Sequence, residues 1–100
     1  MLPCEFHPLA EAELEESVAF YEAAAPGKGL ELAEQIRAAI EELQRFPEAA
    51  PLVRGSIRCK LVQPDTRWHY TIYYRVKPDC LRILAVAHQK RQPFYWFGRR

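Results

Sequence analysis

The sequence is organised around a segment near its C-terminus, residues 80–96, which reads CLRILAVAHQKRQPFYW. Its first half contains an apolar run, from Leu81 to Ala87, with the length and composition of a buried β-strand. It ends at a polar, basic and aromatic cluster that begins with His88 and closes with Trp96. A central strand holds the residues just beyond it more rigidly than an ordinary loop does, so we expect the working surface of the protein at this cluster.

Two helices are expected upstream of this strand. Strong helix formers with apolar residues at spacings of three and four run from Leu9 to Ala25, after Pro8, and again from about Lys28 to Arg45. Residues 25–27 break the pattern, because proline disfavours a helix in the residue before it and glycine frees the backbone to turn. Helices joined by so short a break should form an antiparallel hairpin. Glutamates flank the apolar stripes and are expected to face solvent.

The second half of the chain shows the alternation that is typical of β-strands. After a proline-containing loop over residues 47–55, apolar and basic residues alternate from Ile57 to Leu61. Aromatic and β-branched residues then alternate with polar ones from Trp68 to Val76. Turns at residues 64–66 and 77–79 connect these runs to the apolar run, so the three strands should form an antiparallel meander. Residues 2–7, with a proline at position 3, suit an edge strand.

These elements predict a single α+β domain over residues 1–100. It would consist of an N-terminal edge strand, an antiparallel helical hairpin packed on a three- to four-stranded antiparallel sheet, and a short C-terminal segment. The composition, 49% apolar and 27% charged, is that of an ordinary globular protein. The sequence has neither an apolar stretch of about 18 residues nor an N-terminal signal pattern, so we expect a cytoplasmic protein with no membrane span.

The sequence offers no pattern for a metal or a cofactor. Cys4, Cys59 and Cys80 are widely spaced, form no CxxC pair and do not cluster with histidines. Phosphate-binding and dinucleotide-binding glycine motifs do not occur in it either. We therefore expect no metal site and no cofactor, with the cysteines as small apolar side chains in a reducing compartment.

Charge is divided unevenly along the chain. Residues 1–50 contain eleven glutamates and three basic residues, a net charge of −8, whereas residues 51–100 contain eleven basic residues and two aspartates, a net charge of +9. Such a division predicts an acidic helical side and a basic sheet side. A basic face favours an anionic partner, either nucleic acid or an acidic protein segment. The alternative is charge that only solubilises the protein and is balanced within the fold.

Several residue patterns accompany this order of elements. They are Ala12-x-Leu14, Tyr21-Glu22, Pro26-Gly27-x-Gly29, Ile36 with Ile40, Pro47 with Pro51, Arg58, and Ala85-Val86-x-His88-x-x-Arg91-x-Pro93-x-x-Trp96. Together they resemble the RelE/ParE superfamily of toxins from bacterial type II toxin–antitoxin systems, over nearly the whole chain. The closing pattern is the most specific, because it combines six residue types at fixed offsets.

The resemblance implies one of two activities. RelE-like members are ribosome-dependent endoribonucleases that cleave mRNA, whereas ParE-like members inhibit DNA gyrase. The long glutamate-rich hairpin, the PGxG turn and the HxxRxPxxW ending favour the ParE-like branch. That branch implies a toxin of plasmid stabilisation type, with a cognate antitoxin and DNA gyrase as partners and no membrane partner. The RelE-like alternative implies the ribosome and mRNA, and either a homodimer or a toxin–antitoxin hetero-oligomer fits the resemblance.

Each activity has its own candidate residues. Cleavage of RNA needs an acid, a base and a cation near the phosphate, roles that His88, Tyr95 and Arg91 would take in the RelE-like alternative. His88 and Arg91 equally suit a structural role in holding the C-terminal segment on the sheet, so no catalytic residue is favoured. Contacts to a target or antitoxin should use aromatic and basic anchors. The expected binding residues are Arg58, Lys60, Arg67, Trp68, Tyr73, Arg75, Arg91, Phe94 and Tyr95.

Overall fold

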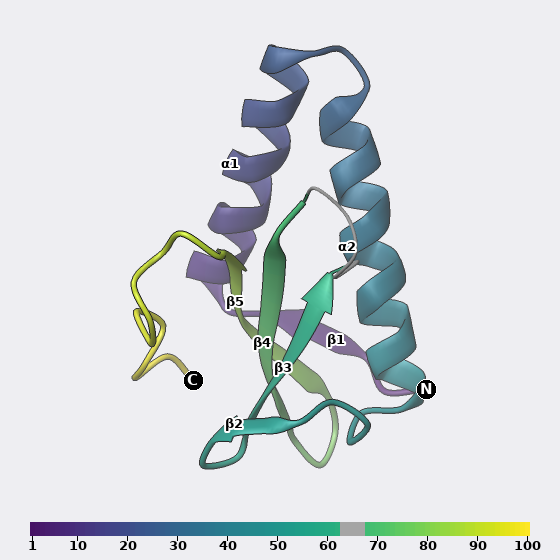
Figure 1. Cartoon of the computed structure of the whole chain (residues 1–100). Coiled ribbons are helices and arrows are strands. Elements are labelled where there is room, and N and C mark those ends of the chain that lie inside the picture. The colour runs from purple at the N-terminus through teal and green to yellow at the C-terminus, as the bar shows by residue number, and fades with distance from the viewer. Residues whose placement is uncertain (63–67) are drawn as a thin grey trace.

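In a computed structural model, which describes residues 1–62 and 68–100, two helices cover one face of a five-stranded sheet (Figure 1). The elements follow in the order β1 (Cys4–Phe6), α1 (Pro8–Ala24), α2 (Lys28–Arg45), β2 (Leu52–Arg54), β3 (Ile57–Val62), β4 (Tyr70–Val76) and β5 (Leu81–His88). The strand order across the sheet is β1-β5-β4-β3-β2. Residues 89–100 form a series of turns that returns alongside β5 and the start of α1 (Figure 1). The predicted α+β class and the helical hairpin are confirmed.

The sheet differs from the prediction at both of its edges. Its centre is the expected antiparallel meander, in which Cys59 pairs with Tyr73 and Tyr73 with Ala85. At one edge β1 runs parallel to β5, because the chain crosses over through both helices and three strands before it returns beside β1. At the other edge, the segment expected to be a loop contains β2, antiparallel to β3. All three residues of β2 are exposed, so no apolar alternation marked it as a strand.

The main core lies between the helices and the sheet. Ile36 and Leu43 of α2 are almost fully buried against a sheet face that includes Ile72 and Ile83. On β4 this face consists of the alternate residues Tyr70, Ile72 and Tyr74, as the period of two predicted. Burial of each such side chain contributes on the order of 2 kcal/mol to folding, so this layer fixes the position of the hairpin on the sheet.

Two features of the helix–helix turn explain its PGxG pattern. Gly27 has a φ of +89°, a left-handed backbone conformation that glycine adopts without strain. Gly29 is buried where the helices touch, and a Cβ atom there would overlap the carbonyl oxygen of Val18. The Glu22 carboxylate accepts hydrogen bonds from the backbone N–H groups of Gly27, Gly29 and Leu30, at 2.8, 2.9 and 3.3 Å. It therefore caps the N-terminus of α2 from the end of α1.

A small second core lies on the face of the sheet away from the helices. A bulge at Leu84, between the pairs Tyr73–Ala85 and Tyr74–Ile83, places both Leu84 and Ala85 on that face. Trp96 from the C-terminal segment packs against them and is 1% exposed. The C-terminal segment thus covers part of the face that the helices leave open, and Trp96 is its apolar anchor.

Three further observations concern the expected absences. Neither helix in the described part of the chain combines the length and the apolar character needed to cross a membrane. Within residues 1–62 and 68–100, no group of three or more His, Cys, Asp or Glu side chains is placed to hold a metal ion. The three cysteines are free thiols, and burial, followed by the nearby Cys80, raises the pKa of Cys4 to about 11. Cys4 is therefore protonated at neutral pH.

Candidate functional site

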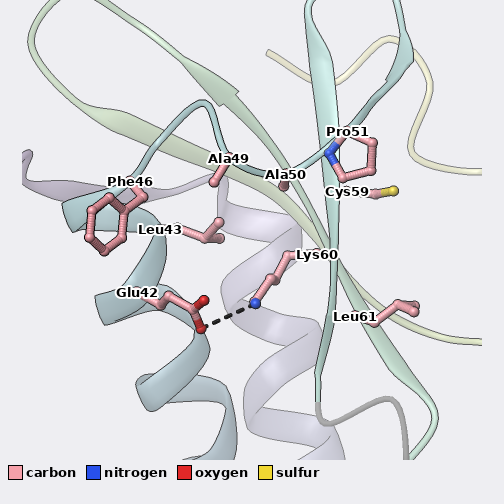
Figure 2. Close-up of a pocket in the computed structure, with 9 residues that line it drawn as sticks. All are labelled: Glu42, Leu43, Phe46, Ala49, Ala50, Pro51, Cys59, Lys60 and Leu61. Carbon is pink, nitrogen blue, oxygen red and sulfur yellow. Dashed lines mark ion pairs between the residues drawn. The ribbon is translucent and has the colours of Figure 1, made fainter.

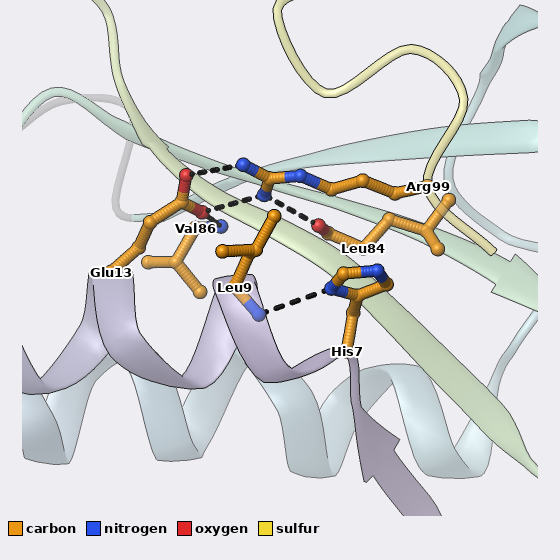
Figure 3. A network of polar contacts seen from close by, with 6 residues as sticks. All are labelled: His7, Leu9, Glu13, Leu84, Val86 and Arg99. Atoms are coloured by element: carbon orange, nitrogen blue, oxygen red, sulfur yellow. Dashed lines mark hydrogen bonds and ion pairs between the residues drawn. The ribbon is translucent and has the colours of Figure 1, made fainter.

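The C-terminal segment is held in place by an ion pair between Arg99 and Glu13 of α1 (Figure 3). Their side chains are 12% and 11% exposed, and the guanidinium makes two contacts of 3.1 Å with the two carboxylate oxygens. Arg99 also donates to the carbonyl of Leu84 at 2.9 Å, and Glu13 accepts from the N–H of Val86 at 3.0 Å. Charge-assisted bonds of this two-pronged form are among the stronger polar contacts in proteins.

These bonds have a clear cause in the sheet. The edge strand β1 ends at Phe6, beside Ile83, and the last backbone contact on that side is the N–H of His7 with the carbonyl of Ile83. Beyond this point, within the described residues, no strand lies beside the outer edge of β5. Buried backbone groups require hydrogen-bond partners, and the Glu13–Arg99 pair supplies them for β5. In the same region the Nδ1 atom of His7 accepts from the N–H of Leu9 and caps α1 (Figure 3).

The anchored segment presents a group of basic and aromatic side chains, which we call the C-terminal patch. It consists of Arg54, Arg91, Phe94, Tyr95 and Phe97. The Arg91 guanidinium lies 3.9 Å from the centre of the Tyr95 ring, and that of Arg54 lies 4.6 Å from Phe97 and 5.3 Å from Phe94. Phe94 and Phe97 are 43% and 62% exposed. The patch thus joins β2 to the C-terminal segment and faces solvent.

A hollow of about 210 Å³ lies beside the patch. It is lined by residues of β4, of the end of β5 and of the C-terminal segment, among them Thr71, Tyr73, His88, Arg91, Phe94, Tyr95 and Trp96. The three residues of the ribonuclease alternative, His88, Arg91 and Tyr95, therefore line one hollow. Tyr73 and Trp96 both line it, and the centroids of their rings lie 4.6 Å apart.

The chemical state of these residues limits what the hollow can do. The Nδ1 atom of His88 accepts from the N–H of Lys90 at 3.1 Å, and the ring packs edge-on against Tyr70. Burial, with Lys90 and His69 as further causes, lowers the pKa of His88, so its imidazole is neutral near pH 7. Burial and the nearby Glu13 carboxylate raise the pKa of Tyr95, so its hydroxyl holds its proton strongly. Of these two residues, His88 can act as a base, but Tyr95 is a poor acid.

The other expected binding residues lie apart from the patch. Arg58 faces the helix side and donates to the carbonyls of Glu48 and Ala50, at 3.0 and 2.7 Å. Arg75 donates to the hydroxyl of Ser56. Trp68 is 4% exposed and packs edge-on against Tyr21. Arg67 lies outside the described residues.

Lys60 belongs to a second hollow, of about 460 Å³, between the end of α2 and β3 (Figure 2). Its ammonium group forms an ion pair of 3.2 Å with Glu42 across this hollow. Phe46 and Leu61, which also line it, are 62% and 54% exposed. The structure therefore brings together Tyr73, Arg91, Phe94 and Tyr95 from the expected set, and places Lys60 at a separate, more apolar site.

Sequence reasoning missed the residue that orders the candidate site. All glutamates of the first half were expected to face solvent, and this is wrong for Glu13, whose side chain is only 11% exposed and is paired with Arg99. The two residues are 86 positions apart, and no local pattern links them. A usable signal was the pair of arginines at the end of a segment, residues 80–100, that contains no acidic residue of its own.

Comparisons with known proteins give a consistent result. Residues 4–93 match the model of a family described as the ParE toxin of the type II toxin–antitoxin system parDE. Among solved structures, one titled "Chromosomal ParDE TA system from P. aeruginosa" has a similar fold, with a TM-score of 0.73 and 23% sequence identity. The match covers 88% of this chain and 96% of that one. A search of curated proteins found no match.

Proposed function

Because the chain belongs to the ParE toxin family of type II toxin–antitoxin systems, we propose that it acts by binding and inhibiting DNA gyrase and that a cognate antitoxin neutralises it. The observation that carries this proposal is the C-terminal patch. Exposed aromatic rings stacked with arginines are the side chains that dominate binding energy at protein interfaces. They are held on a rigid sheet by Trp96 and by the Glu13–Arg99 pair.

The position of the exposed surfaces suggests how an antitoxin would inhibit the toxin. An antitoxin segment that covers the C-terminal patch would block the surface that meets the target, so toxin and antitoxin would form an inactive hetero-oligomer. The second hollow, with exposed Phe46 and Leu61, offers apolar surface that the same partner would cover. A segment that folds as it binds is suited to span two such sites. Since gyrase is a cytoplasmic enzyme, the proposal places the toxin in the cytoplasm.

A ribosome-dependent endoribonuclease is the second candidate function. It is favoured by one observation, that His88, Arg91 and Tyr95 line a single hollow. It is opposed by the raised pKa of Tyr95 and by the use of Nδ1 of His88 in a local hydrogen bond. A base without a matched acid would catalyse phosphodiester cleavage weakly.

The test is a supercoiling assay with purified gyrase and relaxed plasmid, run in parallel with a translation extract in which mRNA cleavage is followed. The proposal expects supercoiling to stop and mRNA to stay intact. Replacement of Arg91 by Ala should raise the toxin concentration needed for half-inhibition by about tenfold, as expected for a central arginine anchor. The control Arg45→Ala, at the end of α2 on the helix side, should leave this concentration unchanged. Normal supercoiling at saturating toxin together with mRNA cleavage that His88→Ala abolishes would instead establish the second candidate.

A further inference from the structure

Two arginines of the C-terminal patch differ from most others in the described chain. Arg58, Arg75, Arg82 and Arg99 all donate to oxygen atoms of the protein. Within residues 1–62 and 68–100, the guanidinium groups of Arg54 and Arg91 have neither a carboxylate nor another hydrogen-bond acceptor. Each is instead held over an aromatic ring. Stacking fixes the plane of a guanidinium and leaves its N–H fork free for a two-pronged contact with an oxyanion.

The two arginines of the patch are both cationic, and the Glu13 carboxylate near Tyr95 is paired with Arg99. The two stretches of sequence that build the patch, residues 49–62 and 80–100, contain eight basic residues, two of them on the helix side, and no acidic residue. An electrostatic field of this kind attracts an extended polyanion, because successive negative charges all gain from it. A folded partner with isolated carboxylates would place fewer negative charges in this field and would gain less from it.

The patch also offers flat apolar surface at the same place. Phe94 and Phe97 are exposed beside the arginines, and the adjoining hollow has walls formed by Tyr73, Tyr95 and Trp96. A basic surface interleaved with aromatic rings is the arrangement by which proteins hold a single nucleic-acid strand, with phosphates on the arginines and bases on the rings. An acidic peptide would supply the charge but no ring to occupy the hollow.

We propose that the C-terminal patch binds a single strand of DNA, with Arg54 and Arg91 on its phosphates and an unstacked base in the hollow beside Tyr73. This goes beyond gyrase inhibition and rests on that proposed function only in one respect, since gyrase is the enzyme that would bring DNA to the toxin. The two ideas are separable, because DNA binding is measured with the toxin alone.

The experiment measures the fluorescence anisotropy of a labelled single-stranded DNA of about 15 nucleotides, a length that spans one such patch. Wild-type toxin is compared with Arg54→Gln, Arg91→Gln, the double variant, and the control Arg45→Gln, which removes the same charge on the helix side. The double variant should bind at least about tenfold more weakly, as expected when charged hydrogen bonds are lost. Its slope of log affinity against log salt should be shallower by about 1.4, or about 0.7 for each phosphate contact removed. The control should stay within about twofold of wild type.

Two further arms decide between ligands. A duplex of the same sequence should bind at least about fivefold more weakly, because its bases are stacked and cannot enter the hollow. Polyglutamate of equal charge should not displace the DNA at equal concentration. Unchanged affinity of the double variant, equal loss in Arg45→Gln, equal binding of the duplex or displacement by polyglutamate would each overturn the proposal. Because all of these variants change exposed side chains without hydrogen bonds in the described chain, retained thermal unfolding midpoints confirm that they fold.

Discussion

Arg99 and Glu13, which lie 86 residues apart in the sequence, close the open edge of β5 with a two-pronged ion pair. The pair binds a carbonyl and an N–H group of the strand and ties the end of the chain to α1. The ordered position of the C-terminal patch therefore depends on a contact with the helical hairpin.

We predict that Arg99→Ala destabilises the protein by about 3 kcal/mol, because it leaves the Glu13 carboxylate without its partner in a nearly buried site. Urea unfolding measures this value. The double variant Glu13→Gln with Arg99→Ala should lose less than the sum of the two single changes, since no uncompensated charge then remains. Arg100→Ala, at the exposed neighbouring position, is the control and should change the free energy of unfolding by less than about 0.5 kcal/mol. Equal effects at positions 99 and 100 would contradict the role of the pair.

Local sequence patterns predicted most of the helices and strands, but they did not predict which face of a strand packs against the helices. The helical period and the proline–glycine break predicted the hairpin because these signals act over a few residues. In β3 the alternation predicted which residues share a face, but not which face meets the helices. Ile57 packs on the face away from the hairpin, and the alternation of the strand places Cys59 and Leu61 on the same face. Lys60 faces the hairpin and pairs with Glu42. Period alone carries no information on that choice.

The same reasoning explains what could be predicted of the site. Arg91, Phe94 and Tyr95 come together because they are neighbours in the sequence and follow a central strand. Arg54 joins them from the other edge of the sheet, through a strand of three residues that is exposed throughout. Glu13 takes part because β1 is too short to pair with all of β5. Both contributions depend on tertiary contacts, which local periodicity does not record.

The cap formed by Glu22 leads to a prediction about pH. Hydrogen bonds from the N–H groups of Gly27, Leu30 and Gly29 lower the pKa of Glu22 in the folded protein. A carboxyl whose pKa falls on folding stabilises the protein above its unfolded pKa, and this stabilisation is lost as the pH falls through the folded pKa. Wild type should therefore be more stable than Glu22→Gln near pH 7, and the difference should shrink below the ordinary carboxyl pKa of about 4.3.

Chemical denaturation at a series of pH values tests this behaviour of Glu22. The control is Glu16→Gln, which removes an exposed carboxyl of the same helix that has no hydrogen-bond partner within the described residues. The difference between wild type and Glu16→Gln should be small at every pH. A constant difference between wild type and Glu22→Gln from pH 7 to acid would show that the ionised form is not what caps α2.

Gly29 provides a test of the contact between the helices. Gly29→Ala adds a Cβ that overlaps the carbonyl of Val18, a backbone atom that cannot move without shifting α1. We predict a net destabilisation of about 2 kcal/mol, although alanine alone favours a helix by about 1 kcal/mol over glycine. Ala38→Gly, at an exposed position of α2, measures the ordinary preference in the same helix. A Gly29→Ala variant more stable than wild type would rule out the close approach.

The last prediction separates the anchor of the C-terminal segment from its contact surface. Trp96 is buried against Leu84 and Ala85, so Trp96→Ala should cost about 3 kcal/mol and release the segment from the sheet. Phe97 is the next residue but is 62% exposed, so Phe97→Ala should cost less than about 0.5 kcal/mol. If the patch is the surface that meets the target, both variants should relieve growth arrest, the first by unfolding the site and the second by removing a ring from a folded one. Thermal unfolding of each purified variant, set beside growth after induction without the antitoxin, makes this distinction. Full arrest by a stably folded Phe97→Ala protein would move the contact surface away from the C-terminal patch, because an exposed ring next to Arg54 would then contribute nothing to it.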